Sequence, residues 1–198
     1  MAAGIEWLGH ATFRLTGGGR KVYVDPFQVE DPDDADLVLV THDHHDHCSP
    51  EDIEKVSRPD TVIAGPESCR DKVAGLGAEF VAVGQSGGYE AAGVSFSTVP
   101  AYTVGKDFHP RSAGGVGYIV EIGGERVYHA GDTDRIGEMT GVEADVALLP
   151  VGGKYTMTAS EAAEAFRMMK AGRGVPMHYG SIVGSSDDAD EFERLIGG

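Results

Sequence analysis

The chain has little cysteine, and it contains neither a long apolar run nor a leader of the charged-then-apolar type. Its two cysteines, Cys48 and Cys69, are separated by a spacing that fits neither a zinc ribbon nor a disulfide framework. We therefore expect two reduced thiols, with Cys48 packed in the interior rather than lining a site. The absence of an 18-residue apolar run predicts a cytoplasmic protein with no membrane span and no secretory signal.

Basic residues are also scarce, because 16 Lys and Arg stand against 32 Asp and Glu, and the formal net charge is −16. Binding to a nucleic-acid backbone needs an excess of positive charge, so we predict no general nucleic-acid binding. A small-molecule substrate is still expected, and it could be anionic, since cations bound in a site would dominate the local field. A homo-oligomer is left open.

The order of apolar runs and turns predicts one domain that spans residues 1–198 and mixes strands with helices. Glycine is abundant, with 29 residues, which suits many tight turns. The patterns predict strands over residues 4–8, 11–16, 20–25, 36–41, 61–64, 79–83, 94–99, 117–122, 126–130 and 145–150, with a short strand ending near 178. They predict helices over residues 49–57, 66–76, 158–171 and 187–196.

The helix over 158–171 has the strongest signals of the four. Thr158 and Glu161 form a capping-box pattern, the apolar positions recur at helical spacing, and Gly172 supplies a stop.

Residues 42–47 contain four of the eight histidines together with two aspartates. They follow the apolar run 35–40 and precede the helix-start signal Ser49-Pro50, so they lie where a strand passes into a helix. His42 and His44 are at alternating positions and can point the same way, while Asp43 and His45 are expected to point away and to support the others. Imidazole and carboxylate groups are typical ligands of divalent metals.

The pattern His42-x-His44-x-Asp46-His47 resembles the signature of the metallo-β-lactamase superfamily. In that family the two histidines spaced by one residue hold one metal, and the adjacent Asp-His pair holds the second. The resemblance covers nearly the whole chain. It implies an α+β fold, a four-layer αββα sandwich, and two divalent metal ions, with Zn²⁺ as the first choice and Mn²⁺, Fe²⁺ or Ni²⁺ as alternatives.

Further residues match the same family. Gly131-Asp132-Thr133, after a predicted strand, resembles the segment whose aspartate bridges both metals, and His178 resembles the last metal ligand. Gly9-His10 and Asp25-Pro26 occur in the branch that includes L-ascorbate 6-phosphate lactonase and N-acyl phosphatidylethanolamine phospholipase D. His10 therefore lies either near the metals or at the surface or core edge, and His129 is left as a core residue or a support for a ligand.

The chain departs from the branch at one place. A Pro-Ala-x-His segment usually supplies a histidine to the first metal, but here the sequence is Pro100-Ala101-Tyr102-Thr103. Threonine is a poor zinc ligand, so we hypothesise that His109, six residues further on in a loop, completes the site.

The resemblance implies a metal-dependent hydrolase in which a hydroxide bridged between two metal ions attacks an ester, lactone or phosphodiester. Asp46 and Asp132 are the expected catalytic carboxylates. The expected metal ligands are His42, His44, Asp46, His47, His109, Asp132 and His178. Loop residues Lys106, Arg111, Lys154 and Tyr155 either contact an anionic substrate or are simple surface. The alternative is a metal-binding or sensing protein of the same fold without turnover.

Overall fold

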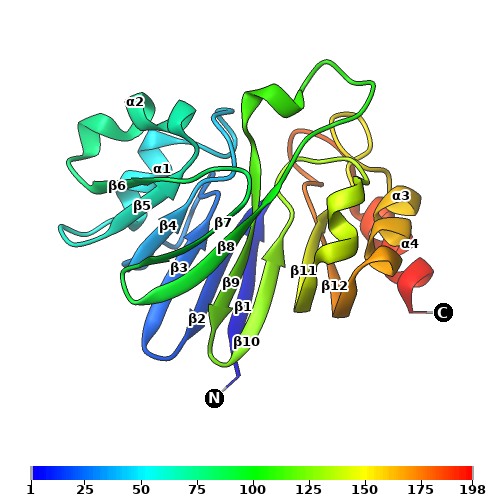
Figure 1. The fold of residues 1–198 in the computed structure, drawn as a ribbon, viewed down its shortest axis with the longest axis horizontal. Coiled ribbons are helices and arrows are strands. Elements are labelled where there is room, and N and C mark those ends of the chain that lie inside the picture. The colour runs from blue at the N-terminus through cyan, green and yellow to red at the C-terminus, as the bar shows by residue number, and fades with distance from the viewer. Residues whose placement is uncertain (1, 198) are drawn as a thin grey trace.

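Two six-stranded β-sheets pack face to face in the computed structural model, which describes residues 2–197 (Figure 1). The first sheet contains, in spatial order, β1 (Gly4–Gly9), β2 (Thr12–Gly17), β3 (Arg20–Val24), β4 (Leu37–Leu39), β5 (Val62–Gly65) and β6 (Glu79–Ala82). The second sheet contains β12 (Lys170–Met177), β11 (Glu143–Pro150), β10 (Glu125–His129), β9 (Val116–Ile122), β8 (Val94–Pro100) and β7 (Gly87–Ala91).

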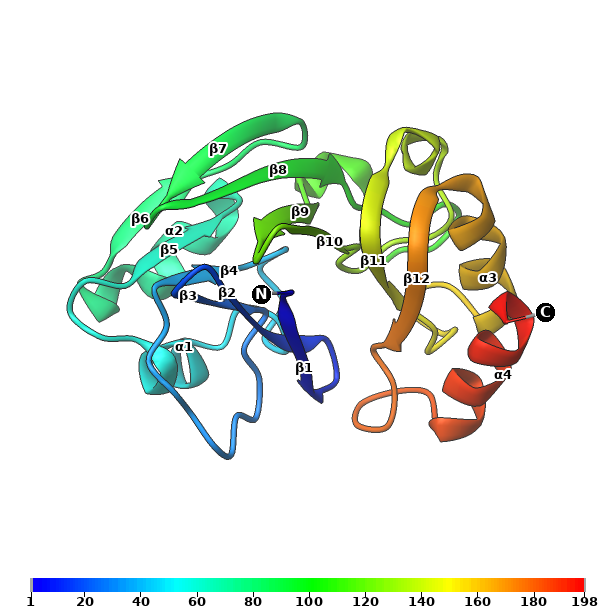
Figure 2. The same cartoon turned by 90° about the horizontal axis from the view of Figure 1, so that it is seen from below.

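Helices cover the outer faces of both sheets, which makes four layers. The helices α1 (Pro50–Val56) and α2 (Arg70–Val73) lie on the first sheet, and α3 (Ala159–Met168) and α4 (Ser186–Ile196) lie on β11 and β12 of the second (Figure 2). Short 3₁₀ turns span Glu67–Cys69, Ala74–Leu76, Arg111–Ala113 and Gly137–Gly141. The predicted αββα sandwich is therefore confirmed.

Strand β4 shows how the sequence sets these layers, because side chains alternate between the two faces of a strand. Leu37 and Leu39 belong to the main core between the sheets, whereas Val38 and Val40 belong to a smaller core beneath α1 and α2. Cys48 is buried in that smaller core, as expected for a packed thiol. A strand that is apolar on both faces is thus held between two layers, and the loop that follows it starts from a rigid base.

The strand directions bring several loops to one edge of the sandwich. Strands β3 to β6 run parallel to one another, and so do β10 to β12, while the remaining neighbours are antiparallel. Parallel strands place their carboxyl ends at the same edge of a sheet. The segment between β8 and β9, green in Figure 1, arches over this edge.

The predicted helix over 158–171 was wrong in its second part. The helix has its capping box but ends at Met168, and β12 begins at Lys170 and pairs in parallel with β11. Glycine explains the difference, because a Cβ on Gly172 would lie 2.8 Å from the carbonyl oxygen of Asp145, and one on Gly174 would lie 2.9 Å from the ring of Phe192. These glycines allow close approach to β11 and α4, which a helical stop signal alone does not reveal.

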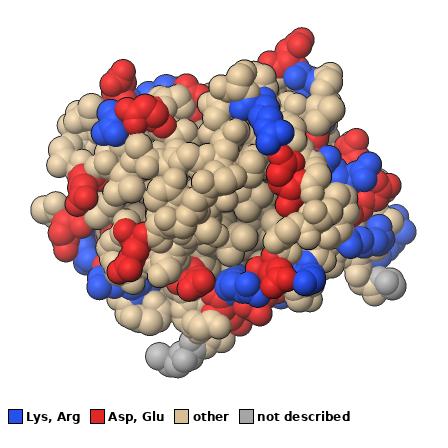
Figure 3. All heavy atoms as spheres, viewed as in Figure 1, with Lys and Arg blue, Asp and Glu red and all other residues tan. Residues whose placement is uncertain are grey.

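The predicted helix over 66–76 is divided into 3₁₀, α and 3₁₀ turns and ends at Gly77, whose φ of +69° suits glycine. None of the helices within residues 2–197 has the length and apolar character needed to cross a membrane. On the face shown in Figure 3, the lysines and arginines lie in separate places around a broad uncharged area.

Candidate metal centre

The candidate ligands all come from segments that follow the carboxyl end of a strand. The turns and loops that carry the site directly follow β1, β3, β4, β10 and β12. His109 lies in the long segment after β8. The residues in question are His10, Asp25, His42, His44, Asp46, His47, His109, Asp132 and His178. The structure therefore brings together all seven predicted metal ligands and adds His10 and Asp25 beside them.

Asp132 lies at the middle of this arrangement and is buried. Its Oδ1 is 3.4 Å from Nε2 of His47, and its Oδ2 is 3.1 Å from Nε2 of His178 and 3.3 Å from Nε2 of His109. One carboxylate thus faces imidazoles that come from three separate segments. A carboxylate with both oxygens engaged in this way can serve two neighbouring cations.

The first group of donors is formed by His42, His44 and His109, whose ligand atoms all lie within 4.8 Å of one another. Nε2 of His109 is 3.1 Å from Nδ1 of His44. His44 is exposed, while His42 and His109 are buried, so this group borders solvent on one side.

The second group contains Asp46, His47, His178 and also His10. Nε2 of His10 is 3.0 Å from Oδ2 of Asp46, and its ring centroid is 4.1 Å from that of His178. His42 and His47 form a third group with Asp132, which connects the other two. Of the two alternatives for His10, the structure places it beside the candidate ligands, where it orients Asp46 or adds a fourth donor.

Asp25 fixes the candidate ligand loop through hydrogen bonds. Its carboxylate accepts the backbone N–H and the hydroxyl of Thr41, each at 2.7 Å, and Nδ1–H of His47 at 2.7 Å. The Thr41 hydroxyl, having donated to Asp25, accepts from Nδ1 of His42 at 3.0 Å. Both imidazoles are therefore oriented through Nδ1, which leaves Nε2 of each free to face a cation.

Electrostatics of the metal-free centre follow from this packing. Burial raises the pKa of Asp132, but the adjacent His178 and His47 outweigh it and hold that pKa well below its ordinary value. Burial lowers the pKa of His47, but the carboxylates of Asp132 and Asp25 hold it well above its ordinary value. Burial, together with the charge on His47, keeps the pKa of His42 well below its ordinary value. Without metal, a proton on His47 neutralises part of the carboxylate charge.

The donor set fits divalent cations on the basis of its unpaired atoms. Among the described residues, Nε2 of His42, His47 and His178 and Oδ1 of Asp132 are buried and have no hydrogen-bond partner. A buried polar atom without a partner costs about 1–3 kcal/mol, so these four atoms, which belong to two adjoining donor groups, favour bound cations as their partners. Imidazole nitrogens and a carboxylate oxygen together suit Zn²⁺ and similar cations.

The structure also shows what Thr103 does in place of the expected histidine. Its backbone N–H donates to the carbonyl of His109 at 2.9 Å, and its hydroxyl accepts the His109 backbone N–H at 3.3 Å. Thr103 thus closes the loop that brings His109 to His44 and Asp132. The ligand role of His109 remains a prediction, but its imidazole has the position that the role requires.

The remaining singled-out residues are outside the three donor groups. His45 is exposed and its Nδ1 lies 3.5 Å from Oδ1 of Asp46, whereas Asp43 contacts Lys72 on the outside. His129 is a core residue, because its Nε2–H donates to the Ala11 carbonyl at 2.8 Å and its Nδ1 accepts the Gly131 N–H at 3.2 Å.

Four loop residues were predicted to be either substrate contacts or simple surface. Lys106 forms an ion pair with Asp134, Arg111 forms one with Glu138, and the ammonium of Lys154 lies over the ring of Tyr155. Only Tyr155 lines the cavity over the centre.

That cavity has a volume of about 300 Å³ and opens above Asp132 and the surrounding histidines. Its rim is formed by Phe108, Tyr155 and Ile182, and the rings of Phe108 and Tyr155 meet edge to face with centroids 4.7 Å apart. Phe108 and Ile182 are each more than two-fifths exposed. Exposed apolar side chains beside buried polar groups are typical of a small-molecule site.

Sequence reasoning missed the role of Asp25 and left His10 undecided. The signal for both was the type of residue at a strand end, Asp-Pro after β3 and Gly-His after β1. Both residues have positive φ, +48° and +49°, which is uncommon for residues other than glycine and often found at functional sites.

Comparisons with known proteins agree with this geometry. A family model described as a beta-lactamase superfamily domain matches residues 4–178. A UPF0173 metal-dependent hydrolase of Thermococcus kodakarensis is 35% identical over 207 residues, which cover 98% of this chain and 92% of that protein. The corresponding protein of Methanopyrus kandleri is 37% identical over 211 residues, covering 97% of this chain and 90% of that protein.

Solved structures give the same result. A protein of Parabacteroides distasonis, assigned as a metal-dependent hydrolase, has a TM-score of 0.86 at 32% identity and covers 98% of this chain and 88% of its own. A metallo hydrolase of Ignicoccus hospitalis has a TM-score of 0.82 at 24% identity, covering 100% of this chain and 91% of its own, and supports the fold. The chain therefore belongs to the metallo-β-lactamase superfamily and, within it, to the UPF0173 metal-dependent hydrolases.

Proposed function

We propose that this protein hydrolyses an ester, lactone or phosphodiester bond of a small molecule with the help of two divalent cations, Zn²⁺ being the first choice. The observation that carries this proposal is the position of Asp132, whose two oxygens face His47 on one side and His109 and His178 on the other. The sequence matches at Gly9-His10 and Asp25-Pro26 favour the branch that includes L-ascorbate 6-phosphate lactonase, and we keep that branch as part of the proposal.

His42, His44 and His109 would hold one cation, and Asp46, His47 and His178 the other, with Asp132 shared. When bound, the cations supply Lewis acidity and lower the pKa of a coordinated water towards neutrality. The protein's own groups orient the donors: Asp25 and Thr41 fix the rings of His47 and His42, and His10 fixes Asp46.

The cavity rim then decides how a substrate lies. Phe108, Tyr155 and Ile182 exclude water from one side of the centre and offer apolar contact. Because Lys106 and Arg111 are already paired with Asp134 and Glu138, contact between an anionic substrate group and the protein would fall mainly to the cations.

The test is a substrate panel of generic esters, lactones and phosphodiesters, assayed with Zn²⁺, with Mn²⁺ and with a chelator. We expect turnover that requires metal and falls at least 100-fold in the Asp132→Asn variant, which loses one negative charge at the centre. Asp107→Asn is the matched control, because Asp107 is exposed in the loop beside His109 and should keep full activity. Two bound metals per chain with no turnover of any substrate would favour the metal-binding or sensing alternative.

A further inference from the structure

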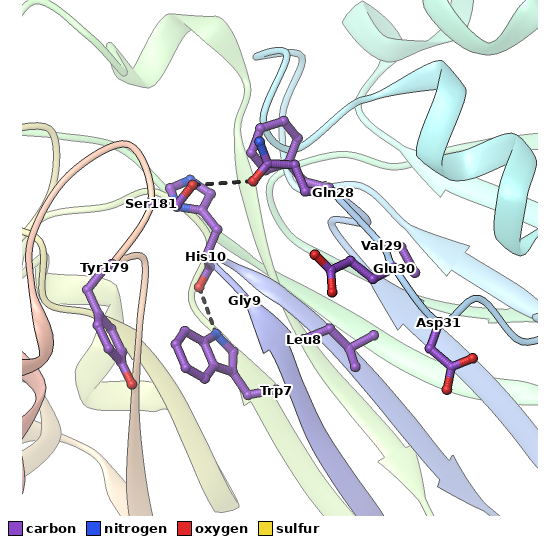
Figure 4. Close-up of a pocket in the computed structure, with 12 residues that line it drawn as sticks. Trp7, Leu8, Gly9, His10, Gln28, Val29, Glu30, Asp31, Tyr179 and Ser181 are labelled. Carbon is purple, nitrogen blue, oxygen red and sulfur yellow. Dashed lines mark hydrogen bonds between the residues drawn. The ribbon is translucent and has the colours of Figure 1, made fainter.

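A second cavity borders His10 beside the metal centre (Figure 4). Its volume is about 450 Å³, which is enough for a small organic group. It is lined by the end of β1, by the segment after β3 and by the segment after β12. Ser181 lines this cavity while the next residue, Ile182, lines the cavity over Asp132, so the two cavities are neighbours.

One wall of the second cavity is aromatic. The rings of Trp7 and Tyr179 are stacked with centroids 4.7 Å apart and an interplanar angle of 22°. The indole N–H of Trp7 donates to the His10 carbonyl at 2.9 Å, which fixes the orientation of that ring, yet the residue is still 39% exposed. Phe27 adds a third ring. Such faces attract apolar groups and, through their π-electrons, organic cations.

The charge of the wall is negative. Lys and Arg are absent from the twelve residues of the described chain that line the cavity, and two of the twelve are carboxylates, Glu30 and Asp31. In Figure 4 the carboxylate of Glu30 points back towards Gly9 and the aromatic pair, whereas that of Asp31 points away from them. An anionic group would be repelled here, and a cationic group would be attracted.

We propose that this cavity binds an organic ammonium group of the substrate, with its apolar body on Trp7 and Tyr179 and its charge facing Glu30. The inference rests on the proposed function and narrows its substrate class to molecules in which a cationic, apolar portion lies beside the bond to be cleaved. His10 separates the two cavities, since the residue lines the second one and its Nε2 contacts Asp46, which lines the first.

Binding can be measured directly because Trp7 is the single tryptophan of the chain. The probes are phenethylammonium, 2-phenylethanol and phenylacetate, which share a ring and differ in charge, and the readout is the intrinsic fluorescence of Trp7 in the metal-loaded and the metal-free protein. We expect saturable changes with phenethylammonium, at least fivefold weaker binding of the neutral probe, and no saturation with the anion.

Two variants of neighbouring carboxylates make the test specific. Glu30→Gln should weaken phenethylammonium at least fivefold and leave 2-phenylethanol unchanged, whereas Asp31→Asn, whose carboxylate points away, should change either affinity less than twofold. Both residues are exposed, so neither change disturbs the core. Equal binding of all three probes, or equal effects of the two variants, would overturn the proposal.

A turnover assay then separates a substrate site from a site for a free effector. Among esters cleaved by the protein, those with an ammonium group should have a higher kcat/KM than neutral ones, and Glu30→Gln should remove the difference. If the ammonium probe binds but the preference is absent, the assignment to substrate is wrong while metal-dependent hydrolysis stands. If no ester is cleaved, the fluorescence result still decides whether the cavity selects cations.

Discussion

His178 donates its backbone N–H to the carbonyl oxygen of His10 across 2.8 Å. The two residues directly follow β12 and β1, which belong to different sheets, and both have left-handed backbones with φ of +59° and +49°. Such conformations cost of order 1 kcal/mol each for residues other than glycine and persist only where the surroundings fix them. This contact joins the sheets at the metal centre and places both imidazoles beside Asp46.

Replacing Asp25 by Asn should weaken metal binding without unfolding the protein. The amide cannot accept from Nδ1–H of His47 and from Thr41 as the carboxylate does, so both rings lose orientation. We expect a 10- to 100-fold loss of metal affinity, in the range found for such supporting groups. Competition with a chelator measures the loss. Asp33→Asn, at an exposed carboxylate, is the control, and unchanged affinity in Asp25→Asn would refute the orienting role.

His109→Ala should remove one ligand of the first cation and reduce binding to one tightly held ion per chain. Thr103→Ala should have a smaller effect, because Thr103 contacts only the backbone of His109. Metal content after dialysis distinguishes the two variants. Full retention of two ions in His109→Ala would show that the imidazole is no ligand.

Metal binding should release protons and weaken as the pH falls. His47 has a pKa well above its ordinary value in the metal-free protein, owing to Asp132 and Asp25, so its proton must leave when a cation binds. Lower pH retains that proton, and metal affinity falls because ligands must give up their protons to bind a cation. Calorimetry in buffers of different ionisation enthalpy counts the protons. Asp25→Asn should release fewer, and an equal number would contradict this account.

The stability of the metal-free protein should also depend on pH. The pKa values of His10, His42 and His109 are lowered, chiefly by burial, so the unfolded chain takes up protons at these residues first as the pH falls. Their contribution is complete above the ordinary value and is lost as the pH falls below about 6.5. The raised pKa of His47 opposes this, since its contribution is present at low pH and lost as the pH rises. Urea unfolding at pH values above and below about 6.5 should show a lower free energy of unfolding on the acid side. A higher free energy of unfolding there would refute the prediction.

Tyr118→Phe should destabilise the protein while leaving the ligands in place. The buried hydroxyl of Tyr118 donates to the Val40 carbonyl at 2.7 Å and thereby connects β9 to the segment that leads into the ligand loop. Loss of this bond leaves a buried carbonyl without that partner, at a cost of about 1–2 kcal/mol. Chemical denaturation measures it. Tyr89→Phe is the comparison. It removes a hydroxyl that accepts the exposed backbone N–H of Gly84, and it should cost less because water can replace that hydroxyl.

The sequence by itself determined the candidate ligand loop over 42–47, the central carboxylate Asp132 and the late His178. Each of these lies at a strand end with its own short-range pattern. The same holds for the αββα architecture, which followed from the resemblance that these motifs carry. The sequence alone did not place β12 correctly. The glycines at 172 and 174 act through contacts with Asp145 and Phe192, and no local pattern encodes these contacts.

Only the tertiary structure decided that His10 and Asp25 join the centre and that His109 reaches it. His10 meets Asp46 across 36 residues, and His109 meets His44 across 65. Such distances are set by how the two sheets bury their apolar faces against each other, and that burial is a property of the whole chain. The cavity beside Trp7 arises in the same way, from three segments that become neighbours only when the sandwich closes.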